Sequence, residues 1–516
     1  MPLPRPRRPR LPKHPQWPGY GVLATLVGIG LAHLVAALTH PASSPVLAVG
    51  SAVIDLTPTP LKEWAIRQFG TADKVVLVGS VLVGVLVLAA VAGVLARRRL
   101  AVGAGVLVAL VGVAVVAVLS RPEAGALDLL PSLVAAVTGP VALALLARAD
   151  RAAREGRRAG RGAEGRRALL LTAGVLGVLA LAGGVAGRFV SSLRLRPEDV
   201  TLPRPADPAP PLPRGLDDQV PGITPFRTPT GDFYRVDTRL DVPVVGTDDW
   251  TLTIDGDVDR KVTMRFDELL AMPMIERDIT LTCVSNSVGG PYVGAARWLG
   301  VPLRDVLDRA GIGSTKADQI LSTDVDGMTI STPLDLALDG RDAILAVGMN
   351  GKALPREHGF PVRMVIPGLY GFISATKWIT RLTLTTYAER DAYWTERGWA
   401  TDAPIKISAR IDTPRALAAL DPGDVVIGGV AWAQERGGVA GVQVRIDGGG
   451  WVDAQLGPSG GDDYWRQWFY RWKADGGSHR IAARARSGDG EPQTAVRAEP
   501  FPDGASGLHE LIVQVG

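Results

Sequence analysis

The sequence predicts a multi-domain chain: an all-α transmembrane region, then an α+β domain, then an immunoglobulin-like β-sandwich. The mean hydropathy of the 516 residues is positive at +0.16 although 21% of them are charged. Both values can hold only if apolar and polar segments are separated along the chain. Long apolar runs lie within the first 190 residues, and short alternating strands dominate the chain beyond residue 404. These patterns predict the order of the three parts.

Five apolar runs in the first part approach the roughly 20 residues that a membrane-spanning helix needs. They are residues 21–39, 75–95, 100–119, 129–146 and 168–187. The segment 45–54 is too short to span and is expected to be a loop or an interfacial segment. Uncharged runs of this length are improbable as buried helices of a soluble protein. We therefore expect residues 1–190 to form a membrane anchor with five transmembrane helices.

Basic residues cluster in three segments of the anchor and predict its orientation. Arginines and a lysine precede the first span, a triplet follows the second, and eight arginines separate the fourth from the fifth: Arg5, Arg7, Arg8, Arg10, Lys13; Arg97, Arg98, Arg99; Arg148, Arg151, Arg154, Arg157, Arg158, Arg161, Arg166, Arg167. A cytoplasmic N-terminus places all three segments inside. The chain after about residue 190 would then lie outside the cytoplasmic membrane. Topology accounts for these charges, so no nucleic-acid binding is predicted.

Arg166 and Arg167 directly precede a moderately apolar span, and this pattern has two interpretations. The pair is either a twin-arginine export signal or the last two of the topogenic arginines. The export signal is favoured if the outer domain folds around a cofactor before export.

The outer half divides at changes of composition. Residues 191–225 are proline-rich and predict an extended linker. Residues 226–403 mix expected strands at 250–255 and 278–283 with expected helices at 265–270 and 301–310, which favours an α+β domain. Residues 404–516 contain short strands, with Val442, Val444 and Ile446 alternating with polar residues. This spacing is typical of an immunoglobulin-like sandwich.

Cys283 is the single cysteine of the chain. A lone cysteine is usually a small buried hydrophobic residue. Here it ends an expected strand and enters the polar loop Val-Ser-Asn-Ser-Val-Gly-Gly, where a thiolate could reach a metal. One cysteine and six scattered histidines do not build a zinc or iron–sulfur site. If Cys283 binds a metal, most of the other ligands must come from a cofactor.

The residues around Cys283 resemble the cysteine loop of the sulfite oxidase family. The resemblance begins with Leu-Thr-Cys-Val-Ser-Asn at 281–286 and Ala-Arg-Trp-Leu-Gly-Val-Pro-Leu-Arg-Asp-Val-Leu at 296–307. It continues through 350–368 and Thr-Lys-Trp at 376–378, in the family order. It covers roughly residues 226–516 and includes the sandwich, which is similar to the family's dimerisation domain and implies a homodimer.

The resemblance implies a molybdenum bound by a pterin dithiolene, oxo groups and Cys283. His358, Arg363 and Lys377 match positions that hold the pterin and its phosphate, and Asn286 is expected to contact the pterin. Arg235 resembles an arginine that approaches the substrate pocket.

Trp399 departs from the family pattern, because sulfite-oxidising members carry a tyrosine at this place near the metal. An indole offers an N–H donor but no hydroxyl. Fold and cofactor survive this change, whereas sulfite as the substrate is put in doubt.

The function implied is oxygen-atom transfer on a small-molecule substrate, with electrons passed to a separate cytochrome or membrane redox protein. No haem is expected, because the C-x-x-C-H motif is absent and the membrane histidines His33 and His40 both lie on or beside the first span. Two alternatives remain: a reductase of sulfoxides or N-oxides in the same family, and a non-enzymatic surface protein that binds ligands through its sandwich.

Overall fold

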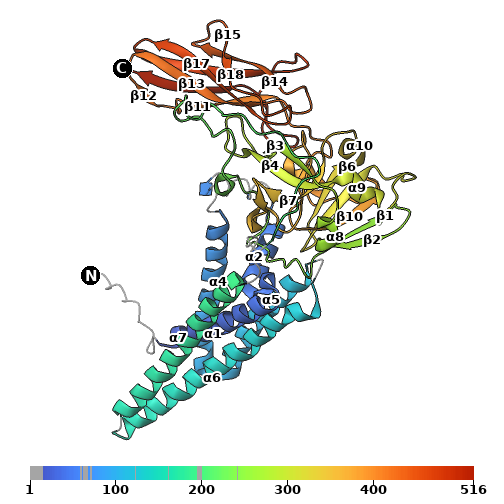
Figure 1. Cartoon of the computed structure of the whole chain (residues 1–516). Coiled ribbons are helices and arrows are strands. Elements are labelled where there is room, and N and C mark those ends of the chain that lie inside the picture. The colour runs from blue at the N-terminus through green and yellow to red at the C-terminus, as the bar shows by residue number, and fades with distance from the viewer. Residues whose placement is uncertain are drawn as a thin grey trace. The chain divides into compact units, whose positions relative to one another are not determined.

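A computed structural model describes residues 16–58, 61, 68–69, 73–121, 124–160, 162–193, 200–240 and 242–516. The chain forms two compact units (Figure 1). The helical unit comprises Met1–Arg194 with Thr238–Val244, and the β-rich unit comprises Leu195–Asp237 with Val245–Gly516. The predicted basic residues Arg5, Arg7, Arg8, Arg10, Lys13 and Arg161 lie outside the described residues, as does part of the predicted linker.

The helical unit contains the helices that the apolar runs predict. The long helices are α1 (Gln16–Leu38), α4 (Asp73–Arg98), α5 (Leu100–Leu119), α6 (Leu130–Arg158) and α7 (Gly162–Leu193). Among the described residues, five helices are long and apolar enough to cross a membrane. Segment 45–54, expected to be a loop or interfacial, lies in a short helix, α2 (Pro45–Leu56). Its residues are apolar and Pro45 starts the helix, where a missing N–H costs nothing.

Glycines let the long helices approach one another closely. A Cβ added at Gly21 of α1 would lie 1.9 Å from the carbonyl oxygen of Ala89 in α4. A Cβ at Gly93 of α4 would lie 2.1 Å from the carbonyl oxygen of Trp17. Gly30 meets the backbone of α7 in the same way. Helix association through small residues is typical of membrane proteins. In lipid there is no hydrophobic driving force between helices, so close backbone packing takes a larger part in their association.

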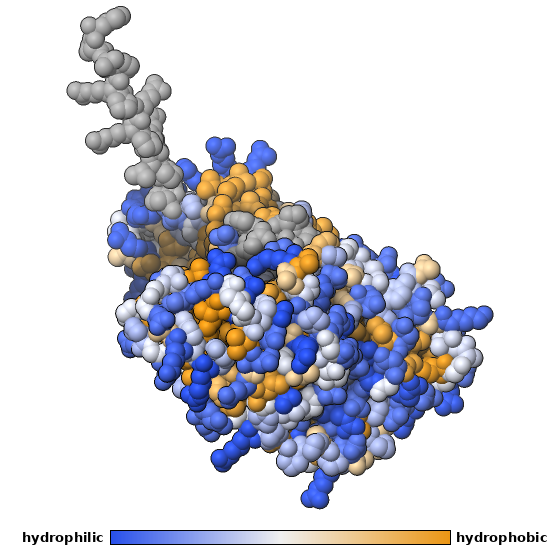
Figure 2. All heavy atoms as spheres, turned by 90° about the horizontal axis from the view of Figure 1, so that it is seen from above, coloured by the Kyte–Doolittle hydropathy of each residue, from blue (hydrophilic) through white to orange (hydrophobic). Residues whose placement is uncertain are grey.

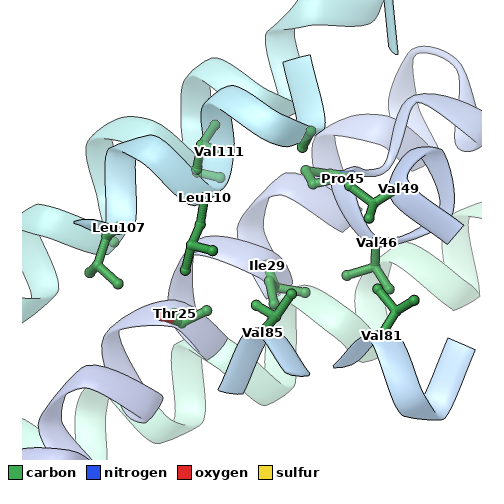
Figure 3. Close-up of a pocket in the computed structure, with 14 residues that line it drawn as sticks. Thr25, Ile29, Pro45, Val46, Val49, Val81, Val85, Leu107, Leu110 and Val111 are labelled. Carbon is green, nitrogen blue, oxygen red and sulfur yellow. The ribbon is translucent and has the colours of Figure 1, made fainter. Parts of the chain in front are cut away.

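Apolar side chains gather on the surface of the helical unit, whereas the visible face of the β-rich unit is mostly hydrophilic (Figure 2). Large exposed apolar residues include Val83, Val87, Val113, Val178 and Leu181. An apolar pocket lies among α1, α2, α4, α5 and α6 (Figure 3); Thr25 is its one lining residue with a polar side chain. This pocket therefore offers no charged group for the predicted chemistry.

Two sheets form the first part of the β-rich unit. One has the order β2-β1-β10-β5-β6, with strands β1 (Thr251–Gly256), β2 (Val262–Arg265), β5 (Gln319–Asp324), β6 (Thr329–Pro333) and β10 (Ile379–Thr385). The other has the order β3-β4-β7-β8 with β9 beside β7; its strands are β3 (Ile275–Thr282), β4 (Val293–Pro302), β7 (Ile344–Met349), β8 (Lys352–Ala353) and β9 (Arg363–Val365).

Short helices connect these strands: α8 (Phe266–Leu270), α9 (Leu303–Asp308), α10 (Leu334–Ala337) and α11 (Gly371–Ser374). The helix expected at 301–310 is shorter, because β4 continues to Pro302 and α9 begins only at Leu303. The backbone of Pro302 and of its neighbour Val301 pairs with β7, which holds them in the sheet.

Two further sheets follow and share one core. Their orders are β11-β13-β17-β16 and β12-β19-β18-β14-β15. The strands are β11 (Ser408–Thr413), β12 (Ala419–Leu420), β13 (Gly423–Trp432), β14 (Val439–Ile446), β15 (Val452–Asp453), β16 (Gln455–Leu456), β17 (Arg466–Ala474), β18 (Gly477–Ser487) and β19 (His509–Val515). Val442 and Val444 of β14 are buried with Trp468 of β17, so the predicted alternation does mark a core face.

The close helix contacts give a first prediction. Gly93→Ala should destabilise the helical unit by about 1–3 kcal/mol, the cost of overpacking, because the new methyl group meets the backbone of Trp17. Gly84→Ala, on the same helix with nothing within 4 Å of the added Cβ, should be neutral or stabilising by up to about 1 kcal/mol, since alanine favours helix. Thermal unfolding of the full chain in detergent measures both, and equal midpoints would contradict the packing.

Candidate active site

Cys283 is the first residue after β3 and begins the loop to β4. Its backbone N–H donates to the carbonyl oxygen of Tyr292 at 3.0 Å, and the N–H of Asn286 donates to the carbonyl oxygen of Cys283 at 3.0 Å. The side-chain oxygen of Asn286 accepts from the N–H of Tyr292 at 2.9 Å. The buried cysteine is therefore held in a closed turn, and Asn286 has a structural role in that turn.

Three residues expected to hold a cofactor lie together on neighbouring segments. Arg363 begins β9, and its Nη1 donates to the carbonyl oxygen of His358 at 3.2 Å. His358 lies at the end of a short 3-10 helix, Arg356–His358, and its Nε2 lies 3.2 Å from the carbonyl oxygen of Thr230. Lys377 precedes β10, and its Nζ donates to the carbonyl oxygen of Glu357 at 3.3 Å. We call Arg363, His358, Lys377 and the nearby Arg235 the cationic cluster.

Gly359 permits the close approach of two members of this cluster. Its φ of +111° lies in the left-handed region that favours glycine. A Cβ at this position would lie 3.0 Å from the Cβ of Arg363 and 3.1 Å from the Cβ of Lys377. A side chain here would push the two cations apart.

Asp237 is the carboxylate that joins the remaining members, and the sequence had not singled it out. Its Oδ2 accepts from the Nε of Arg235 at 2.7 Å and from the Nζ of Lys377 at 2.8 Å. The Nη2 of Arg235 lies 3.4 Å from Oδ1. The sequence could have indicated this pair, because Arg235 and Asp237 are two residues apart and alternate residues of an extended segment lie on the same side. Arg235, expected near the substrate, is thus placed in the cationic cluster.

Burial and mutual repulsion disfavour the charged forms in this cluster. Burial and, to a smaller extent, the charges of Arg363 and Arg235 lower the pKa of Lys377 to about 8, against the opposing effect of Asp237. Burial lowers the pKa of Arg363 to about 10. Burial, then the charges of Arg363 and Lys377, lower the pKa of His358 to about 4. Near neutral pH Arg235 and Lys377 therefore share the carboxylate of Asp237, and Arg363 adds a third positive charge that acts on Lys377.

Comparison with known proteins identifies the domain that carries the site. The model of the oxidoreductase molybdopterin binding domain matches residues 239–394. The mitochondrial sulfite oxidase of Drosophila melanogaster is 29% identical over 313 residues, which cover 52% of this chain and 53% of that protein. Sulfite oxidase of Gallus gallus is 31% identical over 273 residues, 45% of this chain and 59% of that protein. Residues 239–394 thus match a molybdopterin binding domain, and this part of the chain is similar to sulfite oxidases.

This chain spans little more than half the length of those two sulfite oxidases. A nitrate reductase of Nicotiana tabacum, NADH type 2, is also similar, with 34% identity over 196 residues that cover 33% of this chain and 21% of that enzyme. The matched molybdopterin binding domain implies a molybdenum cofactor carried by molybdopterin.

The cationic cluster fits such a cofactor. The Nε of Arg363 is buried and has no hydrogen-bond partner among the residues that the structure describes. Leaving a buried charged donor unpaired costs free energy, and a phosphate oxygen would pair with it. Burial raises the pKa of the Cys283 thiol, hydrogen bonds from Ser285 lower it, and the charge of Lys377 lowers it to a smaller extent, so the cysteine is within electrostatic reach of the cluster.

Tyr234 is a further residue of this site that the sequence had not singled out. Burial raises the pKa of its phenol above the ordinary value, the charge of Cys283 raises it further, and Arg363 lowers it. The phenol therefore stays protonated at neutral pH. The phenol therefore lies close enough to both Cys283 and Arg363 for their charges to affect its pKa.

Trp399, the departure from the family pattern, lies in an aromatic cluster. Its ring centroid is 5.6 Å from that of Phe372 in α11, 5.2 Å from that of Phe501 and 6.1 Å from that of Trp394. None of these rings belongs to the cationic cluster. Trp399 thus packs against aromatic residues of its own domain and against Phe501 from the C-terminal part of the chain.

The pKa of Lys377 predicts how the stability of the cofactor-free protein depends on pH. The folded-state value of about 8 lies below the unfolded value of about 10.4. Between these values the unfolded chain binds more protons, so the free energy of unfolding should rise with pH, by on the order of 1–3 kcal/mol. Lys377→Met should remove this rise, and Lys352→Met, an exposed lysine on β8, should retain it. Urea unfolding between about pH 8 and about pH 10.4 measures the free energy of unfolding. Equal slopes of this free energy against pH in both variants would contradict the burial of the Lys377 charge.

Proposed function

We propose that this chain is a membrane-bound molybdenum-cofactor oxidoreductase that transfers an oxygen atom to or from a small substrate on the outer face of the cytoplasmic membrane. The observation that carries the proposal is the pairing of Cys283 with the cationic cluster. A thiol suits molybdenum as a soft ligand, and the buried cations suit the phosphate of the pterin. Neither group alone would distinguish this site from a structural one.

The residues of the site divide into two roles. Arg363, Lys377 and His358 hold the pterin and its phosphate. Cys283 is the protein ligand to the metal, and its closed turn fixes the direction of the thiolate. When bound, the cofactor supplies two-electron oxygen-atom transfer.

Three further residues act around this centre. Asn286 has its amide oxygen engaged in the turn, which leaves its NH₂ group to donate to the pterin. Arg235 supplies positive charge that attracts an anionic substrate. Trp399 shapes the approach to the metal and offers an N–H donor without a hydroxyl, so a substrate other than sulfite is compatible with the site.

A reductase of sulfoxides or N-oxides is the second candidate. The similarity to a nitrate reductase favours it, since that relative is named for removing oxygen from its substrate. Assays in both directions with artificial electron carriers separate the two functions. In either direction a separate cytochrome or membrane redox protein exchanges electrons with the site.

The domain organisation proposed is a membrane anchor at 1–190, a linker at 191–225, a molybdopterin domain at 226–403 and an immunoglobulin-like domain at 404–516. Five apolar helices support membrane embedding. The two sheets around the core of Val442 and Trp468 support the sandwich, and its likeness to a dimerisation domain supports a homodimer.

The proposed orientation predicts the location of reporter fusions. A fusion at about residue 160 should be cytoplasmic and a fusion after residue 200 external, because the basic segments stay inside. Replacing Arg166 and Arg167 by lysines keeps the charge. If the pair is an export signal, this variant should trap the second reporter inside; if it is only topogenic, the reporter should stay external. A cytoplasmic reporter after residue 200 in the unmodified chain would overturn the orientation.

The role of Cys283 predicts a loss of turnover without a loss of fold. Cys283→Ser keeps nearly the same volume but replaces a readily ionised sulfur with a poorly ionised hydroxyl. Turnover per bound molybdenum should collapse, while Arg363, His358 and Lys377 still retain cofactor. A structural cysteine would instead cost about 1–3 kcal/mol of stability and leave turnover unchanged.

Ser287→Ala, at an exposed position of the same loop, is the matched control and should keep wild-type turnover. Molybdenum content, a melting curve and turnover are measured on all three proteins. A folded, loaded Cys283→Ser variant with wild-type activity would contradict the assignment.

A further inference from the structure

The ring of Tyr234 is held against the cysteine loop by aromatic contacts. It stacks on Phe233, with 5.2 Å between ring centroids and an angle of 19° between the planes. It meets Tyr292 edge-on at 6.4 Å. Tyr292 is the residue whose backbone pairs with that of Cys283. The ring is thus fixed from two sides and has little freedom to turn away from the loop.

The hydroxyl of Tyr234 faces a small space beside the end of β3. A Cβ built on Gly371, the first residue of α11, would lie 4.0 Å from this hydroxyl and 3.8 Å from the carbonyl oxygen of Thr282. Thr282 directly precedes Cys283. Because Gly371 has no side chain, it leaves the space between the phenol and the strand end unfilled.

This hydroxyl has no hydrogen-bond partner among the described residues, and the side chain is only partly buried. Two other tyrosines of the β-rich unit, Tyr464 and Tyr370, have partners, whereas the buried hydroxyl of Tyr387 has none among the described residues. The hydroxyl of Tyr464 donates to the carbonyl oxygen of Phe226 at 2.9 Å, and that of Tyr370 accepts from the N–H of Lys406 at 3.5 Å. A tyrosine hydroxyl held within a protein usually finds a partner. The unpaired donor of Tyr234 is therefore available to a bound group.

We propose that Tyr234 is a catalytic residue that donates a hydrogen bond to the oxygen atom undergoing transfer beside Cys283. The inference rests on the proposed function and adds a residue and a substrate class to it: a small molecule that presents an oxygen with negative charge. The phenol keeps its proton throughout, so no bond of Tyr234 breaks and no electrons pass through it. A fixed donor aimed at developing negative charge stabilises the transition state without needing to reorganise.

The test compares the full-length holoprotein with Tyr234→Phe and Tyr370→Phe. Phenylalanine keeps each ring and removes only the hydroxyl. Tyr370 is the matched control, because burial and, to a smaller extent, the charge of Cys283 raise its pKa, but its hydroxyl already accepts a hydrogen bond from the backbone of Lys406 and its side chain is buried. Each protein is partly reduced with dithionite, and its paramagnetic molybdenum signal is recorded in H₂O and in D₂O.

A coupling from an exchangeable proton should be present in the wild type and in Tyr370→Phe, and lost in Tyr234→Phe. A coupling retained in molybdenum-loaded Tyr234→Phe, or lost equally from both variants, would overturn the inference. With sulfite and ferricyanide, or with dimethyl sulfoxide and a reduced viologen, kcat of Tyr234→Phe should fall on the order of 10²-fold with a smaller change in KM.

The two proposals fail differently. Wild-type protein that carries no molybdenum when produced in a cofactor-proficient host contradicts the proposed function and the inference together. Loaded wild-type protein whose signal is insensitive to the Tyr234 substitution contradicts the inference alone.

Discussion

Burial of positive charge is the constraint on which the site depends. Lys377 and Arg235 share the carboxylate of Asp237, whereas the Nε of Arg363 is buried without a partner among the described residues. Removing a cation from water costs several kcal/mol unless a nearby opposite charge offsets this loss of hydration. An anionic cofactor would supply that charge, so binding it should stabilise the folded domain by mass action.

The local structure serves this constraint. The left-handed turn at Gly359 brings Arg363 and Lys377 together, and the turn after β3 fixes the backbone of Cys283. A domain that is completed by its cofactor is best exported after folding. A twin-arginine signal at Arg166 and Arg167, one of the two interpretations of that pair, would meet this need. In that case cofactor binding and folding would come before export.

The sequence predicted the features that depend on local pattern. The spans follow from length and hydropathy, and Cys283 lies at a strand end as expected. Tertiary pairing changed the expected helix at 301–310, because β7 holds Pro302 in the sheet. Asp237 and Tyr234 escaped notice, since a carboxylate and an aromatic ring are common residue types. Asp237 and Tyr234 gain their roles from Lys377 and Cys283, which lie more than forty residues away in the sequence. No local sequence pattern encodes such distant interactions.

Molybdenum-edge X-ray absorption of the purified holoprotein tests the central claim most directly. It counts the sulfur atoms bound to the metal without requiring a known substrate. If Cys283 and the cationic cluster together form the cofactor site, the wild type should show the dithiolene sulfurs and one more, and Cys283→Ser should show one sulfur fewer at unchanged molybdenum content. An equal sulfur count in the two loaded proteins would contradict the account.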